Sequence, residues 1–352
     1  MVCLHPDHLC DGIDQCPLYE DEFTCDITCP PTCTCLGLEF TCRGHFNASS
    51  YPRLKYLDGS RSEIQLPYLA SNFDLVFLSL SHCKIRNISN TEELQFPRLI
   101  HLDISHNDLV TLNQDFFSSF PALKVLHLGW NKLLPDSELS FKTRPLPLQL
   151  RHLDLSGITF SQAWIDNFGR NTNNHLKILN LSFVILEKLP SFRGYRGLEV
   201  LDLRIEGVES FPRDILTGFT QLNELYSFNP KLCCTQLLPN HHKSCMSKRE
   251  EISSCENVLR SNIYRVFAWI FSFVSIISNF IIVIFIFQET KISSKLISNF
   301  DILVIMLFVS HALMGVYLLT IAIADGYFRE RYLWVDSFWR ESLICKVIRL
   351  TF

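Results

Sequence analysis

One pattern of apolar residues returns along the middle of the chain and constrains its fold more than any other feature. Each copy has leucine or another apolar residue at most of its positions 1, 4, 6 and 11. Position 9 holds Cys83, Asn107 or Asn131 in the first three copies. A weaker copy begins at Leu54. The clear copies, 22 to 27 residues apart, begin at Leu75, Leu99, Leu123, Leu150, Leu176, Leu198 and Leu222.

This pattern is the signature of a leucine-rich repeat. Positions 3 to 7 of each copy form a short strand whose leucines point to one side. A single copy cannot bury that side, but stacked copies share one continuous core, so we expect a curved solenoid over residues 54–232. The non-leucine strand positions then point outward on the concave face, where a ligand would bind. The pattern specifies a scaffold and not a chemistry.

The residues at position 5 of the copies form one column on the expected concave face. Three of them are aspartates, which would suit a cationic peptide. The alternative is that aspartate is simply common at this repeat position, and both interpretations remain open. Asn180 in the same column belongs to a glycosylation sequon, so either it carries no glycan or that part of the face is not the contact. The candidate ligand-binding residues are Asp103, His127, Asp154, Asp202 and Tyr226.

The cysteines indicate an oxidising, extracellular compartment. Fourteen are present, with eight in residues 3–42 and four in residues 233–255, on both sides of the repeats. Sequons at Asn47, Asn87 and Asn180 agree with this location, although residues 1–25 contain no apolar signal-peptide core. The net charge of -4 argues against a nucleic-acid binder. No nucleophile–base pair or phosphate-binding loop predicts an enzyme.

Residues 1–26 resemble part of an LDL-receptor class A module, whose end reads C-D-G-x-x-(D/Q)-C-x-x-x-x-D-E-x-x-C. The resemblance implies a Ca²⁺ site, because such small modules rely on disulfides and a bound cation. Gln15 replaces a family aspartate and weakens the expected affinity; a solvated acidic loop is the alternative. The implied ligands are the side chains of Asp11, Asp21 and Glu22 and the backbone oxygens of His8 and Ile13.

The family has six cysteines, and this chain contains the last four. By resemblance Cys10 pairs with Cys25, whereas Cys3 and Cys16 would pair with cysteines that precede Met1. We therefore expect the chain to be truncated at its N-terminus.

Two further cysteine groups resemble the caps of extracellular leucine-rich repeats, which cover the apolar ends of the array. In the N-terminal cap, residues 27–53, the resemblance implies the bridges Cys29–Cys35 and Cys33–Cys42. His241 and His242 could suggest zinc in the C-terminal cap and hinge, residues 233–262, but their spacing fits no common site and favours a disulfide loop. The pairing there is open among Cys233, Cys234, Cys245 and Cys255.

Two apolar stretches predict transmembrane helices at about 266–287 and 302–324. The disulfides and sequons put the repeats outside the cell, so the linker 288–301 lies inside. The distribution of lysine and arginine does not decide the orientation.

Motifs in this part resemble relaxin-receptor-type leucine-rich-repeat G-protein-coupled receptors. They are Ser278-Asn279, the run from His311 to Tyr317, and Trp339-Arg-Glu-Ser-Leu-Ile-Cys345. The order of class A module, repeats and helices is peculiar to that group. Residues 263–352 would then be a partial rhodopsin-like domain, with a third helix starting at about 345–352. Cys345 would bridge to an outer loop that lies beyond Phe352, so the chain is expected to be truncated there too.

His311 stands where the resemblance expects a sodium-binding aspartate that contacts Asn279. An ionisable residue inside a span is a functional hypothesis by default. Histidine could keep a hydrogen bond to Asn279 but would not hold Na⁺ as a carboxylate does, so sodium modulation would be lost. The alternative is a drifted or mispredicted gene.

The sequence therefore predicts a multidomain α/β membrane protein with a partial class A module, a capped leucine-rich-repeat solenoid, two transmembrane helices and the start of a third. The predicted function is that of a plasma-membrane G-protein-coupled receptor for a peptide or protein hormone. The repeats would bind the hormone, the class A module would act in activation, and the intact receptor would couple to a heterotrimeric G protein. The alternative is a membrane-tethered leucine-rich-repeat adhesion or decoy protein without such coupling.

Overall fold

The computed structural model divides the chain into two compact units, Met1–Ser247 and Lys248–Phe352. The boundary falls before the residue 262 that was expected to end the cap and hinge. Residues 253–259 belong with the helices, since the backbone oxygen of Cys255 accepts a hydrogen bond from Leu333 N. The structure describes residues 13, 15, 28–63, 69, 72–88, 95–112, 116–133, 148–159, 175–186, 189, 192, 194–206, 211–212, 214–237, 244–247, 253–292 and 298–346.

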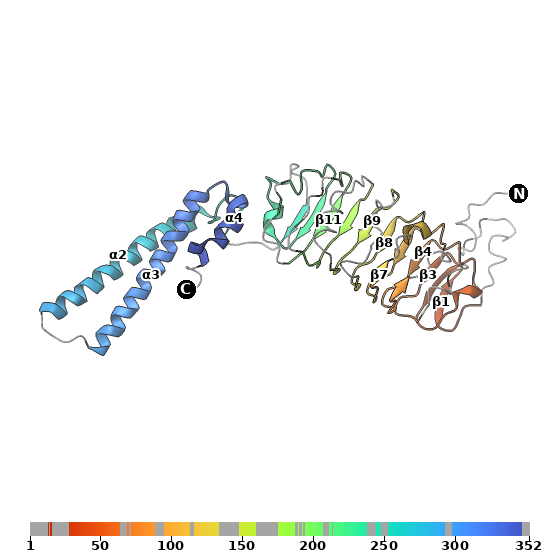
Figure 1. Ribbon diagram of the computed structural model, residues 1–352, viewed down its shortest axis with the longest axis horizontal. Helices are drawn as coiled ribbons and strands as arrows, with labels where there is room; N and C mark the ends of the chain where they lie inside the picture. The colour runs from red at the N-terminus through yellow and green to blue at the C-terminus, as the bar shows by residue number, and fades with distance from the viewer. Residues whose placement is uncertain are drawn as a thin grey trace. The chain divides into compact units, whose positions relative to one another are not determined.

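The first unit contains a sheet of eleven strands among its described residues, with β1 and β2 antiparallel and all later neighbours parallel. These strands lie side by side along the unit (Figure 1). Two short strands, β5 (Asn87–Ile88) and β7 (Thr111–Leu112), form a second sheet. The main strands are β1 (Cys33–Leu36), β2 (Glu39–Cys42), β3 (Tyr56–Asp58), β4 (Phe77–Ser79), β6 (His101–Asp103), β8 (Val125–His127), β9 (His152–Asp154), β10 (Ile178–Asn180), β11 (Val200–Leu203), β12 (Glu224–Ser227) and β13 (Ser244–Ser247).

The leucines of the repeat pattern form the core of this unit. Those at positions 1 and 4 are almost completely buried in every clear copy, and each contributes roughly 1.5–3 kcal/mol relative to exposure. Leu54 and Leu57 of the weaker copy are also fully buried, and the strand that contains Leu57, β3, pairs with β4. The solenoid therefore includes this copy, as the spacing predicts. Among the described residues, the 3-10 helices η2 (Ala48–Ser50), η4 (Phe116–Ser119) and η6 (Pro230–Cys233) lie between strands.

Asparagines at position 9 stabilise the turn that follows the strand. The Oδ1 atom of Asn107 accepts hydrogen bonds from the backbone N–H groups of Cys83 (2.9 Å) and Ile85 (3.0 Å). Its Nδ2 donates to the backbone oxygens of Leu80 (2.8 Å) and Ile104 (3.0 Å). The side chain thus satisfies buried backbone groups of two successive copies, which would otherwise cost free energy.

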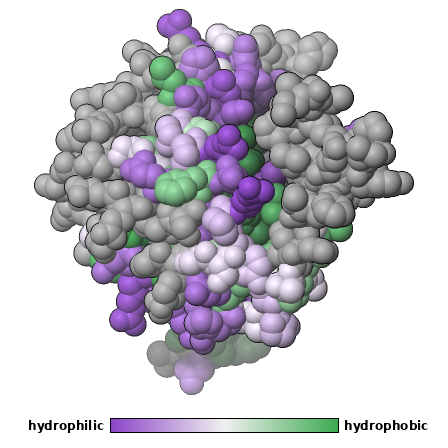
Figure 2. Space-filling view, turned by 90° about the vertical axis from the view of Figure 1, so that its right-hand side faces the viewer, coloured by the Kyte–Doolittle hydropathy of each residue, from purple (hydrophilic) through white to green (hydrophobic). Residues whose placement is uncertain are grey.

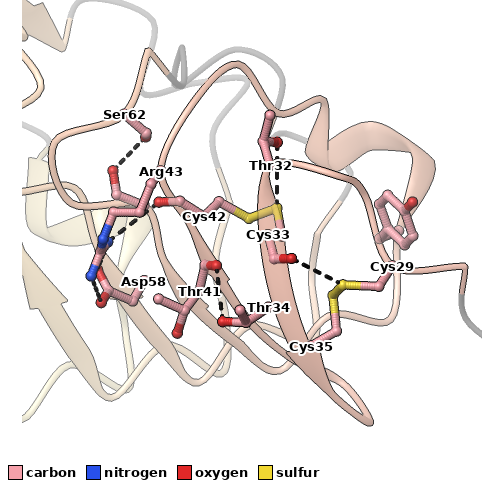
Figure 3. Close-up of a disulfide and its surroundings, with 12 residues drawn as sticks. Cys29, Thr32, Cys33, Thr34, Cys35, Thr41, Cys42, Arg43, Asp58 and Ser62 are labelled. Carbon is pink, nitrogen blue, oxygen red and sulfur yellow. Dashed lines mark hydrogen bonds and ion pairs between the residues drawn. A yellow bond between two sulfur atoms is a disulfide. The ribbon is translucent and has the colours of Figure 1, made fainter.

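The N-terminal cap contains the two disulfides that the resemblance implies, Cys29–Cys35 and Cys33–Cys42. Figure 3 shows Cys33–Cys42 across the β1–β2 hairpin, Cys29–Cys35 between β1 and the segment before it, and the guanidinium of Arg43 turned toward Asp58 of the weaker copy. Among the described residues on the end face of the array, hydrophilic and neutral colours predominate over hydrophobic ones (Figure 2). The cap therefore ends the leucine core with a largely polar surface.

The C-terminal end of the array is covered by β13, which pairs in parallel with β12. A disulfide joins Cys233 to Cys245, and Cys234 and Cys255 are also disulfide-bonded. The sequence left the pairing of these four cysteines open, and the structure fixes the first bridge. His241 and His242 lie outside the described residues.

The second unit contains two long apolar helices that run side by side, α2 (Asn262–Ile292) and α3 (Asn299–Phe328) (Figure 1). Each is long and apolar enough to cross a membrane, and only 6% of its most apolar stretch is buried, which is unlike the core helix of a soluble protein. They extend beyond the predicted spans by one turn or more at most ends. Gly315 allows their close approach, because a Cβ there would lie 2.8 Å from the side chain of Ile276.

A short helix, α4 (Tyr332–Glu341), contains Trp339, which begins one of the motifs that carry the receptor resemblance. Tyr332, Leu333 and Asp336 are buried while Phe338 is exposed, so the first turns of α4 pack against its neighbours. Residues 343–346 are helical, and the rest of the expected third-helix start lies outside the described residues.

Candidate ligand-binding face

The strand register places the predicted position-5 residues in one column. Each β-strand pairs with the next without a shift, so Asp103 lies beside His127, and His127 beside Asp154. Asp202 lies beside Tyr226 in the same way. The structure therefore brings together the five candidate residues in the order expected from the sequence. Ser79 at one end and Asp202 toward the other are the most buried members.

The aspartates of this column all have a local structural role. One carboxylate oxygen of Asp103 accepts a hydrogen bond from Ser105 N at 2.9 Å, and Asp154 accepts one from Ser156 N at the same distance. Asp202 binds the backbone N–H of Arg204 at 3.1 Å. Each aspartate thus fixes the turn two residues after itself. This explains why aspartate recurs here, and it leaves only the second oxygen for a ligand.

The second oxygens have different surroundings. In Asp202 the carboxylate is neutralised by Arg204, whose Nε lies 3.0 Å from both oxygens. The same guanidinium lies 5.8 Å from the ring centre of Tyr226, whose hydroxyl donates to Glu224 at 2.8 Å. The positive charge of Arg204 therefore already occupies this end of the column, and a cationic ligand gains less binding free energy there.

The centre of the column is more open to a cation. The second oxygen of Asp103 accepts a hydrogen bond from the Ser79 hydroxyl at 3.3 Å and has no lysine or arginine partner among the described residues. Asp154 Oδ2 lies 3.5 Å from His127 Nδ1. Burial raises the pKa of Asp154, but hydrogen bonds from His127 and Ser156 outweigh it and lower the pKa overall. The Asp154 carboxylate is therefore ionised at neutral pH.

Three histidines flank these aspartates. The ring of His127 lies 5.3 Å from that of His101 and 4.7 Å from that of His152. Burial and the proximity of His127 lower the pKa of His152 to about 4 and also lower that of His101. His101 and His152 are therefore neutral at physiological pH. The sequence places them in the neighbouring column, but it gives no sign that their pKa values are depressed.

A row of aromatic side chains borders the column just beyond the strand ends. His82 stacks on His106 at 4.3 Å and His106 on Trp130 at 5.8 Å. Trp130 contacts Phe183 at 5.7 Å, passing over Gly157. A Cβ on Gly157 would lie 2.7 Å from the Trp130 ring, so glycine at that position makes the contact possible. Sequence reasoning missed this row.

The remaining predicted sites are placed as follows. The calcium side chains and the Cys10–Cys25 bridge lie outside the described residues, and in the part that is described no group of three His, Cys, Asp or Glu residues could hold a metal ion. The sequon residues Asn47 and Asn87 are exposed. Asn180 Oδ1 accepts a hydrogen bond from Ser182 N at 2.9 Å, as the aspartates do.

The expected hydrogen bond between His311 and Asn279 is not formed. Asn279 Nδ2 donates to the backbone oxygen of Ser275 at 2.7 Å, and the Ser275 hydroxyl donates to the backbone oxygen of His311 at 2.8 Å. The His311 side chain is exposed on α3. Ser275, one turn before Asn279, thus connects the Asn279 amide to the His311 backbone, and the loss of sodium modulation stays a prediction.

The sequence analysis also missed a buried carboxylate at the end of α3. Asp325 is completely buried, accepts a hydrogen bond from Leu259 N at 2.8 Å, and forms an ion pair with Arg265 Nε at 2.5 Å. It therefore joins α3 to the start of α2 and to the segment that precedes it. The 66-residue separation between Asp325 and Leu259 left no local signal.

Comparisons with known proteins relate the chain to several leucine-rich-repeat proteins, receptors among them. The leucine-rich-repeat family model matches residues 74–133. The G-protein coupled receptor GRL101 of Lymnaea stagnalis is 34% identical over 135 residues, which make up 38% of this chain and 11% of that protein. Human relaxin receptor 2 is 30% identical over 128 residues, 36% of this chain and 16% of the receptor. Mouse Tsukushi is 29% identical over 179 residues, 48% of this chain and 49% of that protein.

The leucine-rich-repeat domain is thus homologous to GRL101 and the relaxin receptors. The matched part spans less than a fifth of the length of either receptor. Together with the two apolar helices, these relatives indicate a membrane-bound cell-surface protein.

Proposed function

We propose that this protein is a plasma-membrane G-protein-coupled receptor for a peptide or protein hormone. The leucine-rich repeats bind the hormone outside the cell, and the helix bundle of the intact receptor passes the signal to a heterotrimeric G protein. The observation that carries the proposal is the presence, in one chain, of an anionic repeat face and two long, mostly exposed apolar helices. Relatives that are receptors support it.

The proposed contact is the centre of the position-5 column. Asp103 and Asp154 offer carboxylate oxygens that no lysine or arginine neutralises among the described residues, whereas Asp202 is paired with Arg204. A cationic side chain of the hormone therefore gains most near β6 and β9. The class A module, if it binds Ca²⁺, acts in activation and not in this contact.

The binding site can be tested on cells that display the chain. The probes are fluorescent Gly-Arg-Gly-Arg-Gly and Gly-Glu-Gly-Glu-Gly peptides, and the variant is Asp103→Asn with Asp154→Asn. We expect the arginine peptide alone to bind, and the variant to weaken its binding about twofold to thirtyfold, since each of the two exposed charge pairs contributes about 0.2–1 kcal/mol. Glu63→Gln, an exposed change away from the strands, is the control. Equal binding to the variant would refute this contact.

A second candidate is a membrane-tethered leucine-rich-repeat adhesion or decoy protein. The match to Tsukushi favours it, because that alignment covers about half of both proteins. The sequence of the transcript beyond Phe352 separates the two. Five further apolar spans would support the receptor, whereas a stop codon directly after this segment would leave a tethered binder.

A further inference from the structure

A groove of about 530 Å³ lies at the N-terminal ends of strands β3, β4, β6 and β8, on the opposite side of the strands from the aromatic row. Its apolar lining comes from Val76, Pro97, Ile100 and Ala122. Val76 and Ile100 are residues at position 2 of their copies and are only half-buried. The leucine core does not use these side chains, so they form an apolar floor that a ligand can cover.

Cations surround this floor. Lys55 and Lys124 are the position-2 residues of the copies on either side, and they line the groove together with Arg98 and Asp74. Arg98 and Asp74 neutralise each other, with Nη1 and Oδ1 2.9 Å apart. The charge of Lys124 is then opposed by no carboxylate among the described lining residues. Its charge complements an acidic ligand.

Lys124 differs from the other basic residues of this row. Lys177 is paired with Glu199 at 2.6 Å, and Arg151 donates to the backbone oxygen of His175 at 2.9 Å. Lys124 is exposed and has no carboxylate within an ion-pair distance in the part of the chain that the structure describes. Its ammonium group is therefore available to a ligand without first breaking an existing pair.

The backbone holds these residues at fixed intervals. The oxygen of Lys55 accepts the N–H of Val76, that of Val76 accepts Ile100, and that of Ile100 accepts Lys124. Three strand intervals of about 4.8 Å separate the first residue from the last, so the floor is roughly 15 Å long. An extended peptide of four or five residues has that length.

From this geometry we infer that the groove binds an extended acidic peptide segment in which a glutamate or aspartate is flanked by aliphatic side chains. The carboxylate contacts Lys124, and the aliphatic side chains cover Val76 and Ile100. This surface extends the proposed hormone-binding role, and it rests on that role only in assigning the groove and the aspartate column to one ligand. That ligand then carries an acidic segment as well as a basic one.

The test uses the purified chain in lipid nanodiscs and the peptide acetyl-Gly-Leu-Glu-Leu-Gly-amide with photoreactive leucines. After illumination, mass spectrometry locates the adducts. We expect them on the segments around residues 76, 97–100 and 122–124. Peptides with Gln or Lys in place of the Glu should give about fivefold fewer adducts, because an exposed charge pair is lost or reversed.

A charge exchange provides the decisive variant. Lys124→Glu should reduce adducts with the glutamate peptide about fivefold and raise those with the lysine peptide by a similar factor. Lys84→Glu is the matched control, because it makes the same change of charge on an exposed lysine beyond the other ends of the strands. Adducts that lie elsewhere, or that do not respond to Lys124→Glu, would overturn the inference.

The inference and the proposed hormone site can fail separately. Asp103→Asn with Asp154→Asn should leave the adducts of the glutamate peptide unchanged, although it weakens the arginine peptide. If the two Asp→Asn changes alone failed to weaken binding of the arginine peptide, the aspartate contact would be contradicted. If Lys124→Glu alone failed to change the adducts, peptide binding in the groove would be contradicted.

Discussion

Replacement of Asn107 by alanine should destabilise the first repeats more than any other single change of an asparagine at position 9. The side chain makes five hydrogen bonds to backbone groups, two as acceptor and three as donor. Asn131 makes three such bonds. With about 1 kcal/mol per bond and partial replacement by water, Asn107→Ala should cost roughly 3–5 kcal/mol. Asn131→Ala should cost about 2–3 kcal/mol.

Hydrogen exchange followed by mass spectrometry can measure this effect on the whole chain in detergent. In Asn107→Ala the peptides that contain Cys83 and Ile85 should lose protection first, because their N–H groups lose their acceptor. Asn107→Asp should also destabilise, because a carboxylate cannot donate to the oxygens of Leu80 and Ile104. Asn223→Ala, an exposed asparagine at position 2, is the control. If Asn107→Ala changed the exchange free energy by less than 1 kcal/mol, the role given to this side chain would be wrong.

Three other changes test separate parts of the structure. Gly157→Ala should lower the free energy of unfolding by about 1–3 kcal/mol, measured by thermal unfolding, because Gly157 has φ +65° and lies against the Trp130 ring. In a Trp130→Ala background, part of this loss should be relieved. The pKa of His152 is about 4 in the folded chain and about 6.5 in the unfolded chain. Up to about 3 kcal/mol of stability is therefore present above pH 6.5 and is lost as the pH falls toward 4. Denaturation of His152→Gln at several pH values should show a flatter dependence of stability on pH. Gly315→Leu should separate α2 from α3 through its clash with Ile276, so a crosslink between cysteines placed in the two helices should form more slowly. Gly326→Ala, where a Cβ meets nothing within 4 Å, should leave the rate of crosslinking unchanged.

Much of the repeat unit could be predicted from the sequence because the leucines set the register directly. Copies of 22 to 27 residues still align at positions 1 to 6, since the variable residues lie in the connections between strands. The columns of the sheet follow from that alignment without further information. The cap disulfides Cys29–Cys35 and Cys33–Cys42 followed from resemblance, because cysteine spacing alone does not determine pairing.

The contacts that the sequence could not supply depend on residues brought together by folding. Asp325 meets Leu259 and Arg265 only because α3 returns beside α2. Ser275 is polar in a transmembrane segment, but nothing in its position in the sequence shows that its hydroxyl donates to the His311 backbone oxygen. The ion pair between Asp202 and Arg204 has a local signal in the sequence, since Arg204 lies two residues after Asp202, where the turn brings the two side chains together.

The structural and functional interpretations of the aspartate column concern different oxygens of the same side chains. Asn180 performs the backbone task through its amide oxygen, at the same 2.9 Å distance as Asp103 and Asp154. The fold therefore needs an oxygen acceptor at position 5, but it does not need a negative charge. A half-buried carboxylate is more costly to desolvate than an amide, so the charges of Asp103 and Asp154 are not accounted for by the turn that they stabilise. For the same reason Asn is a conservative replacement at both positions, and a loss of cation binding in that variant would report on the charge and not on the fold.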